Sequence, residues 1–256
     1  MVKVSICVVT YNNQKEILNL ISSIYENTKD VNFEVFLVDN NSSDETVELV
    51  EKNYPLVNVV KLSKNLGFGY AHNQVLNKID SQYHVIVNPD ISFNGNVIKV
   101  LCDYLDRNEN VKMITPKVLS QDGTEQHLPK KEPRIKYVIS GRFDRCFKVF
   151  EKIRAEYTMQ DFRFKEPTEI EFATGCFMMI RTELFKKING FDEKFFMYFE
   201  DADLSKRVRQ YGKIVFYPDT FVVHLWNRAS AKKIKFLFIH ISSMIKYFCK
   251  WKFSRK

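Results

Sequence analysis

The sequence predicts an α/β fold in which a mainly parallel central sheet is flanked by helices. Short apolar runs rich in β-branched residues alternate along the chain with segments whose apolar residues recur every three or four positions. The apolar runs are nearly continuous, as expected of strands covered on both faces. Polar clusters follow several of the runs, and in such folds ligands bind at the carboxyl ends of the strands.

The first half of the chain alternates strand and helix regularly. Residues 3–9 (KVSICVV) predict a strand, and residues 15–26 predict a helix because their apolar side chains are spaced by three and four positions. The same pattern continues with strands at 33–38, 57–62 and 84–87, a helix around Val47 to Val50, a glycine-containing loop at 64–70 and a helix at 71–79.

The second half is less regular. Residues 132–167 have weak periodicity, and we interpret them as a partly helical insertion or flap over the site. Order returns at 170–181, followed by helices at 182–188 and 201–211 and strands at 214–217 and 221–224. We expect one domain over residues 1–228 and a basic amphipathic helical tail over residues 229–256.

The distribution of charge limits the classes of function. The chain has 45% hydrophobic and 27% charged residues, as in a globular protein, and a formal net charge of +8. Nine of its basic residues follow Asp219, after which no acidic residue occurs, so residues 1–219 hold 30 basic against 31 acidic side chains. No nucleic-acid-binding motif is present, so nucleic acid is not the expected partner, and a nucleic-acid-binding module using the basic tail is only an alternative.

The cysteines and the N-terminus indicate location. Five scattered cysteines without CxxC spacing imply neither a disulfide framework nor a zinc site, which favours a cytoplasmic protein. The N-terminus lacks the features of a signal peptide, and no run of about 18 apolar residues predicts a spanning helix.

Two polar clusters stand at expected strand ends. In residues 39–44 (DNNSSD), a carboxylate can accept hydrogen bonds from a nucleotide base or a ribose hydroxyl, although a plain helix cap at a turn explains the cluster equally well. In Asn88-Pro89-Asp90, Pro89 ends the strand and presents Asp90, a suitable anchor for a divalent cation that also binds a diphosphate. A strand-end turn without metal is the alternative.

Two further sites lie near the C-terminal end of the expected domain. Glu200, Asp201 and Asp203 open a helix directly after an aromatic run, and desolvation there would raise a carboxyl pKa and favour a general base. Stabilisation of the helix N-terminus by acidic residues is the alternative interpretation. His224 ends a strand, where it is either a structural histidine or a ligand to metal or phosphate.

Together these motifs resemble family 2 glycosyltransferases with the GT-A fold, and in particular the rhamnosyltransferase-like subgroup. The resemblance runs in order over residues 3–228 and rests on VVTYNN (8–13), VDNNSSD (38–44), NLGFG (65–69), NPD (88–90), TGC (174–176) and FEDADL (199–204). Each motif alone is weak, but the joint pattern is specific.

The resemblance implies roles for individual residues. A nucleotide site would comprise Thr10, Tyr11, Asn12, Asp39, Asn41, Asn65 and Gly67. Mg²⁺ or Mn²⁺ would bind Asp90, with His224 and Asn88 as further ligands, while Gly175 and Cys176 would lie beside the acceptor or sugar. Asp201 would be the general base, with Glu200 next to it. The chain departs from the DxD metal motif because neutral Asn88 replaces its first aspartate.

The implied activity is an inverting transfer from a nucleotide-sugar donor to a hydroxyl of a saccharide acceptor in cell-surface polysaccharide synthesis. The subgroup favours dTDP-rhamnose as donor, with UDP- or GDP-sugars as alternatives, and a polyprenyl-linked acceptor. A nucleotidyltransferase acting on a sugar phosphate would also use a metal-binding aspartate. Such an enzyme would need a glycine-rich basic loop after the first strand, and residues 10–13 contain neither glycine nor a basic side chain.

The tail predicts an amphipathic helix. Its apolar stripe consists of Ile234, Leu237, Phe238, Ile241, Ile245 and Phe248, with lysines off the stripe. Such a helix suits an anionic membrane surface, and it would place the protein peripherally at the inner face of the cell membrane. Packing on the domain with a solvated basic face is the alternative.

Overall fold

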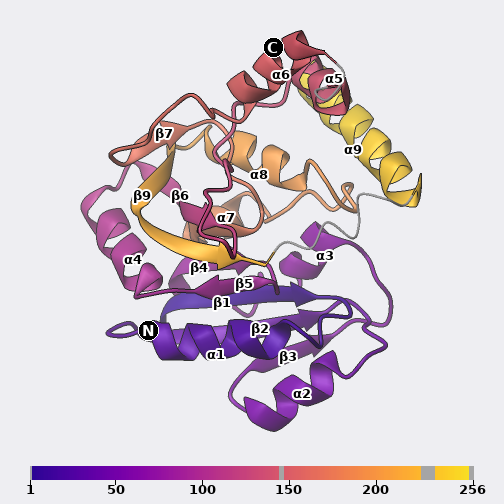
Figure 1. The fold of residues 1–256 in the computed structure, drawn as a ribbon. Helices are drawn as coiled ribbons and strands as arrows, with labels where there is room; N and C mark the ends of the chain where they lie inside the picture. The colour runs from indigo at the N-terminus through magenta and orange to yellow at the C-terminus, as the bar shows by residue number, and fades with distance from the viewer. Residues whose placement is uncertain (1, 144–146, 226–233, 254–256) are drawn as a thin grey trace.

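The structure is a computed structural model that describes residues 2–143, 147–225 and 234–253, and it is an α/β fold built on one central sheet (Figure 1). In chain order its strands are β1 (Val2–Thr10), β2 (Phe33–Asp39), β3 (Asn58–Lys61), β4 (Ser81–Val87), β5 (Ile91–Phe93), β6 (Val111–Leu119), β7 (Thr168–Ile170), β8 (Phe177–Arg181) and β9 (Lys213–His224). Its helices are α1 (Ile17–Asn27), α2 (Thr46–Asn53), α3 (Phe68–Asn73), α4 (Val97–Arg107), α5 (Ile135–Phe143), α6 (Lys148–Tyr157), α7 (Thr182–Lys187), α8 (Glu200–Val208) and α9 (Ile234–Phe253).

The sheet is parallel in its first half and mixed in its second. The strand order is β3-β2-β1-β4-β8-β6-β9-β5, with β7 paired to β9. Strands β3, β2, β1 and β4 are parallel, as predicted, and so are β6 and β9. Strand β8 is inserted antiparallel between β4 and β6, and β5 and β7 are antiparallel to β9.

Helices cover both faces of the sheet, and alternate residues of each central strand point to opposite layers. Val4, Ile6 and Val8 of β1 are buried with residues of α1, α2 and α4. Cys7 and Val9 are buried on the other face with residues of α3, α7 and α8. Helix α1 follows from its sequence, because its four buried isoleucine and leucine side chains lie at three- and four-residue spacing on one face.

Three predicted elements differ in extent from the observed ones. The predicted helix at 71–79 is α3, which begins at Phe68 and ends at Asn73, because the following residues form turns with bonds to the third preceding carbonyl. Residues 170–181 are not continuous, because β7 and β8 are separated by a loop. The predicted strands 214–217 and 221–224 form the single strand β9, whose pairing with β6 shifts register around Pro218.

Other parts of the prediction agree or remain open. The insertion at 132–167 contains α5 and α6, so it is partly helical as predicted. Strands β5 and β6 and helix α4 occupy residues 91–119, where the sequence pattern assigns no element. The expected boundary at residue 228 lies outside the described residues. Among the described helices, none is both long and apolar enough to cross a membrane.

The tail forms α9 as predicted, and it packs on the domain. Its buried Tyr247 and Trp251 contact an aromatic cluster that includes Phe172, Phe195 and Phe199. Helices α5, α6 and α9 lie together at the end of the molecule away from α1 and α2 (Figure 1).

Candidate active site

The loops that follow β1 and β2 are joined to each other at the carboxyl end of the sheet. The Asn12 N–H donates to Ser42 Oγ (2.9 Å), and the Ser43 N–H donates to Asn12 Oδ1 (2.8 Å). Asn12 and Asn41 have positive φ (58° and 69°), which asparagine tolerates better than most residues. Beside this junction Tyr11 is 50% exposed, so the loops present an aromatic ring to solvent at the strand ends.

Asp39 and Asn40 end β2 as buried polar residues. Both carboxylate oxygens of Asp39 lie 3.1 Å from the Ser42 N–H, which donates to them. The Asn40 N–H donates to the carbonyl of Thr10 (2.8 Å), and the Asn40 side chain bonds the backbone of residues 66–67 (2.9 and 3.2 Å). Asn40, to which the sequence pattern assigns no role, therefore connects the loops after β1, β2 and β3.

Gly67 fits tightly against the segment that leads to α8. Its φ is +98°, and a Cβ atom at this position would lie 2.2 Å from the carbonyl oxygen of Phe196. That carbonyl accepts a hydrogen bond from the Phe68 N–H (3.0 Å), and Asn65 Oδ1 accepts one from the Gly67 N–H (3.1 Å). A glycine is needed here both for its conformation and for the close approach. The loop that holds the predicted nucleotide-site residues Asn65 and Gly67 therefore contacts the segment before α8.

Asp90 and His224 meet at the ends of β4 and β9. Asp90 Oδ1 lies 3.3 Å from His224 Nε2, and the Leu225 N–H donates to the Asp90 carbonyl (2.8 Å). Asp90 Oδ1 is buried and accepts no hydrogen bond of good geometry from the described residues. A buried carboxylate oxygen in that state is suited to a cation.

Gln126 orients the His224 ring. Its Nε2 donates to Ser120 Oγ (3.1 Å) and to the His224 carbonyl (3.3 Å), so its Oε1 faces His224 Nδ1 at 3.0 Å and accepts a hydrogen bond from it. In a neutral imidazole the Nε2 lone pair then points towards Asp90. Gln126 is a supporting residue that the sequence pattern does not reveal.

Glu200 and Asp201 begin α8. Asp201 Oδ2 accepts a hydrogen bond from the Gly175 N–H (3.2 Å), and its Oδ1 accepts one from the Ala202 N–H (2.9 Å). Burial raises the pKa of Asp201, and the positive charge of Lys130 opposes that rise. Burial, and then the charge of Asp201, hold the pKa of Glu200 well above its usual range. A carboxylate with a raised pKa is a stronger base, so Asp201 suits proton abstraction.

The tripeptide Thr174–Gly175–Cys176 bridges the two acidic sites. Its central N–H binds Asp201, while the Cys176 carbonyl accepts a hydrogen bond from the Asn88 N–H (3.0 Å). A Cβ on Gly175 would lie 3.4 Å from the Phe68 ring and 3.5 Å from Asp201 Cβ, so this surface is closely packed. Asn88 to Asp90 and Glu200 to Asp201 therefore lie on either side of one short segment.

The turn that leads into α8 has an unusual backbone. Tyr198 and Phe199 have positive φ (71° and 67°), a conformation that costs residues with a Cβ about 1 to 3 kcal/mol each. Phe199 is buried against Tyr247 of α9, with ring centroids 5.4 Å apart. Packing of α9 thus supports the backbone conformation that positions Glu200 and Asp201 at the start of α8.

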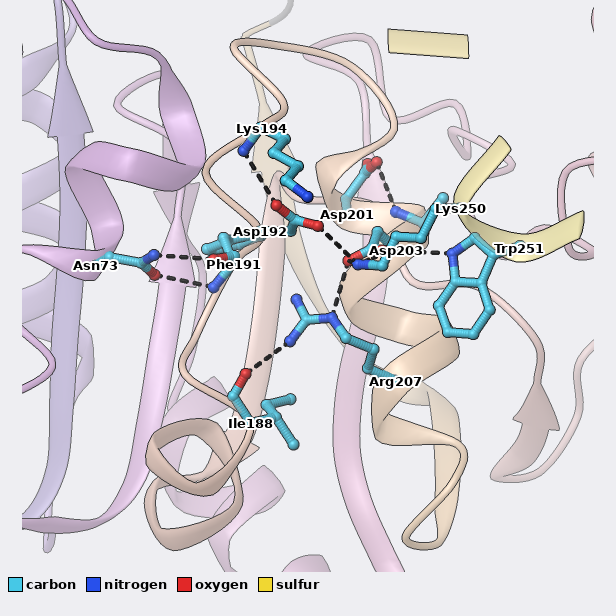
Figure 2. A network of polar contacts seen from close by, with 11 residues as sticks. Asn73, Ile188, Phe191, Asp192, Lys194, Asp201, Asp203, Arg207, Lys250 and Trp251 are labelled. Carbon is cyan, nitrogen blue, oxygen red and sulfur yellow. Dashed lines mark hydrogen bonds and ion pairs between the residues drawn. The ribbon is translucent and has the colours of Figure 1, made fainter. Parts of the chain in front are cut away.

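A second contact between α8 and α9 centres on Asp203 (Figure 2). The Asp203 carboxylate is fully buried and accepts hydrogen bonds from Arg207 Nε (2.8 Å), Lys250 Nζ (2.9 Å) and Trp251 Nε1 (2.9 Å). Lys250 also contacts Asp192 (2.8 Å). The Asp203 carboxylate therefore stabilises the contact between α8 and α9.

The predicted site residues form two groups. The first group consists of the residues in the loops after β1 and β2, at one edge of the sheet, and the second consists of the residues around Asp90 and Asp201. The loop that contains Gly67 connects the two groups, because it contacts Asn40 of the first and Phe196, which precedes Asp201. Within the described part of the chain, no group of three or more His, Cys, Asp and Glu side chains is arranged to hold a metal ion.

Two family models match the chain. The model described as glycosyl transferase family 2 matches residues 5–189, and the model described as N-terminal domain of galactosyltransferase matches residues 155–232. The first match spans the strand-end loops up to the Gly175 segment, and the second includes Asp201 and His224.

Curated proteins of related sequence act on sugars. The chain is 26% identical over 204 residues to the N-acetylglucosaminyl-diphospho-decaprenol L-rhamnosyltransferase of Mycobacterium tuberculosis, covering 74% of this chain and 66% of the relative. It is 30% identical over 135 residues to the poly(ribitol-phosphate) beta-N-acetylglucosaminyltransferase TarS of Staphylococcus aureus, covering 51% and 24%. It is 39% identical over 54 residues to the rhamnosyltransferase WbbL of Escherichia coli, covering 21% and 20%. The chain thus spans two thirds or less of the length of these relatives.

Solved structures confirm the GT-A fold. TarS 1–349 of S. aureus in complex with UDP superposes with a TM-score of 0.63 at 20% identity, covering 96% of this chain and 65% of that one. GalNAc-T7 with UDP, GalNAc and Mn²⁺ superposes with a TM-score of 0.66 at 16% identity, covering 89% and 44%. At these identities the similarity concerns the fold.

Proposed function

This chain belongs to glycosyl transferase family 2, and on that premise we propose that it moves a sugar from a nucleotide-sugar donor to a hydroxyl of a saccharide acceptor. The observation that carries the proposal is the placement of Asp90 and Asp201 on either side of the Thr174–Cys176 segment at the strand ends. One carboxylate is suited to a cation and the other to a proton, which is the division of labour that such a transfer needs.

The donor nucleotide binds in the loops after β1, β2 and β3. Tyr11 offers an exposed ring for stacking, and the buried Asp39 carboxylate can bond the base. Thr10, Asn12, Asn41, Asn65 and Gly67 shape the same edge. Relatives named as rhamnosyltransferases favour dTDP-rhamnose as donor, and UDP- and GDP-sugars are the alternatives to test.

Asp90 would hold Mg²⁺ or Mn²⁺ together with the donor diphosphate, with His224 as a further ligand. The residues fit, because Asp90 Oδ1 is buried without a hydrogen bond from the described chain and Gln126 directs the His224 Nε2 lone pair towards it. When bound, the ion supplies charge neutralisation for the nucleoside diphosphate that leaves. Asn88 contributes at most a neutral oxygen.

Asp201 is the general base in this proposal. It accepts the proton of the acceptor hydroxyl, while its two backbone hydrogen bonds hold the carboxylate in place. Direct attack by that hydroxyl on the anomeric carbon gives an inverting displacement. Glu200 stays protonated to higher pH because it is buried beside Asp201, and it thereby avoids a second negative charge next to the base. Gly175 and Cys176 lie beside the acceptor.

The acceptor is a saccharide, and a relative's name favours a lipid-linked one of the diphospho-polyprenol type. The outer face of α9 is suited to the surface where such a lipid resides. Phe238, Ile241 and Ile245 are 68%, 39% and 53% exposed, and lysines flank them. Aromatic and aliphatic side chains with basic neighbours bind anionic lipid headgroups. We therefore place the protein peripherally at the inner face of the cell membrane, in cell-surface polysaccharide synthesis.

The decisive experiment is transfer from a panel of nucleotide sugars, with Mg²⁺ or Mn²⁺ present and absent, by the parent chain and by Asp201→Asn. The variant should lose about 100- to 10,000-fold in kcat, as expected for removal of a general base, while nucleotide affinity is retained. Asp219→Asn, which changes an exposed aspartate of β9, is the matched control and should be unaffected. No turnover of any donor would refute the proposed activity, and a fully active Asp201→Asn would refute the role of Asp201.

Membrane binding is tested separately by flotation with vesicles that contain anionic lipid and with vesicles of neutral lipid. The parent should float with the anionic vesicles, and a variant with serine at positions 238, 241 and 245 should not. Leu56→Ser is the control, because Leu56 is 80% exposed and lies between α2 and β3, elements on the far side of the fold from α9 (Figure 1). Equal flotation of parent and triple variant would show that α9 is not the membrane contact.

A further inference from the structure

A cavity of about 630 Å³ lies next to the Asp90–His224 pair. It is formed by the segment after β6, the C-terminal end of α6 with the residues that follow it, and the end of β9. Side chains that line it include Gln126, Lys130, Thr158, Gln160 and His224. None of the roles assigned above uses Lys130.

Within the described parts of the chain, Lys130 contacts aromatic rings rather than a carboxylate. Its backbone N–H donates to the carbonyl of Phe172 (3.2 Å). Its Nζ lies 5.3 Å from the centre of the Phe172 ring and 5.9 Å from that of Tyr157, so the ammonium group has two aromatic rings as neighbours. Among the described residues, its Nζ has no hydrogen bond or ion pair within bonding distance.

The Lys130 side chain is half-buried, between the two aromatic rings and the cavity. Burial lowers the pKa of Lys130, and the charge of Asp201 only partly opposes that effect. The Asp201 oxygens already accept hydrogen bonds from the Gly175 and Ala202 N–H groups. Lys130 lines the cavity, so an anion that enters the cavity can pair with its ammonium group.

Lys130 is also close to the reaction centre. Cys176 lies between the two acidic sites, and burial raises the pKa of its thiol to about 11. The charges of Asp90 and Asp201 raise this pKa further and that of Lys130 lowers it, so all three charged groups lie within electrostatic reach of one sulfur atom. An anion bound at Lys130 would thus lie near both the proposed cation site and the proposed base.

We propose that Lys130 binds a phosphate oxygen of a substrate, and that the cavity beside Asp90 is a phosphate subsite. The proposal rests on the proposed function, in which two substrates bring phosphate: the donor through its diphosphate, and a lipid-linked acceptor through its own. The chemistry is the same for both sources. A lysine ammonium with a phosphate oxygen forms a charge-assisted hydrogen bond, which is stronger than a neutral one.

The test compares Lys130→Met and Lys130→Arg with the parent enzyme in two assays. Isothermal titration measures the affinity for dTDP and for UDP with Mg²⁺ present. Steady-state kinetics measure KM for a diphosphate-linked saccharide and for a neutral glycoside of the same sugar. Loss of one charge-assisted hydrogen bond should weaken the affected constant about 10- to 100-fold, and arginine should recover most of it. Lys131→Met is the matched control, because Lys131 is partly exposed and pairs with Glu156 (3.3 Å).

The outcomes separate the two sources. Weaker binding of nucleoside diphosphate by Lys130→Met assigns the subsite to the donor. Unchanged nucleotide affinity with a raised KM for the diphosphate-linked acceptor alone assigns it to the acceptor. The phosphate subsite is refuted, while the proposed function stands, if turnover is intact and Lys130→Met changes neither the nucleotide affinity nor KM for the diphosphate-linked saccharide. It is refuted equally if the variant raises KM for the neutral glycoside as much as KM for the diphosphate-linked saccharide. If Lys130→Met does not fold, a Lys130→Arg variant that loses affinity by more than tenfold also refutes a charge-based role.

Discussion

The contact between α8 and α9 makes a quantitative prediction for Asp203→Asn. The substitution keeps the size of the side chain but removes the charge that Arg207, Lys250 and Trp251 share (Figure 2). Removing one partner of a buried ion pair costs about 3 to 5 kcal/mol. Because the Lys250 side chain is 32% exposed and can be rehydrated, the lower end applies, about 3 kcal/mol. For a chain of this size that loss lowers Tm by about 6 to 12 °C.

Thermal and urea denaturation, followed by circular dichroism at neutral pH, measure this loss. Lys250→Met should cost less, about 1 kcal/mol, because its ammonium group reaches solvent. The double variant should lose less than the sum of the two single losses, since both remove the same interaction. Lys235→Met is the control on the exposed face of α9 and should change stability by less than about 0.5 kcal/mol. Strict additivity, or a Tm shift below about 2 °C for Asp203→Asn, would contradict the assigned role of Asp203.

Two further predictions concern Gly67 and Glu200. Gly67→Ala should lower stability by at least about 2 kcal/mol and weaken nucleotide binding, because its Cβ would meet the Phe196 carbonyl. The control is Gly95→Ala, which has positive φ but open space around it and should lose only about 1 kcal/mol of stability. Equal losses for the two variants in urea denaturation would argue against the clash. The folded chain holds the Glu200 proton to higher pH than the unfolded chain, so its contribution to stability is full below the unfolded pKa and is lost as pH rises through the raised folded pKa. Glu200→Gln should therefore match the parent in urea denaturation at pH 4 and be more stable at pH 8, and a variant less stable at pH 8 would reverse that sign.

The strand ends of the first half were predictable because their physics is local. Apolar β-branched runs specify β1, β2 and β4, and a parallel sheet brings the residues that follow them to one edge. Pro89 follows β4 and cannot continue a central strand, so Asp90 lies at that edge. The order of these motifs along the chain then indicated the resemblance to family 2 glycosyltransferases.

The second half was less predictable because its contacts are long-range. The antiparallel insertion of β8 between β4 and β6 depends on pairing partners that no local pattern identifies. Of the apolar stripe predicted for α9, Phe248 packs on the domain, whereas Phe238, Ile241 and Ile245 are exposed. The helix docks mainly through Tyr247 and Trp251, which are not part of the predicted stripe. Aromatic residues on a nominally polar face are therefore the signal that would have indicated packing on the domain.

Asn40 and Lys130 show two different reasons why site residues escape prediction. Asn40 lies within a recognised motif, but its bonds go to backbone groups, so its side chain supports the loops rather than contacting a ligand. Lys130 lies in no motif, and a sequence with 39 basic residues does not distinguish it from the others. Only the contacts of its ammonium group with Phe172 and Tyr157 do so.

The charge balance of the proposed site explains why a lysine at position 130 would assist substrate binding. In the proposed site, neutral Asn88 leaves Asp90 as the carboxylate of the metal motif, and a cation bound there would depend on the substrate for much of its coordination. In the proposed site, Lys130 would bind the same phosphate groups without requiring a second acidic ligand. Loss of Lys130 should therefore increase the concentration of Mg²⁺ needed for nucleotide binding, whereas a lysine that served only to pack against the aromatic rings would leave that concentration unchanged.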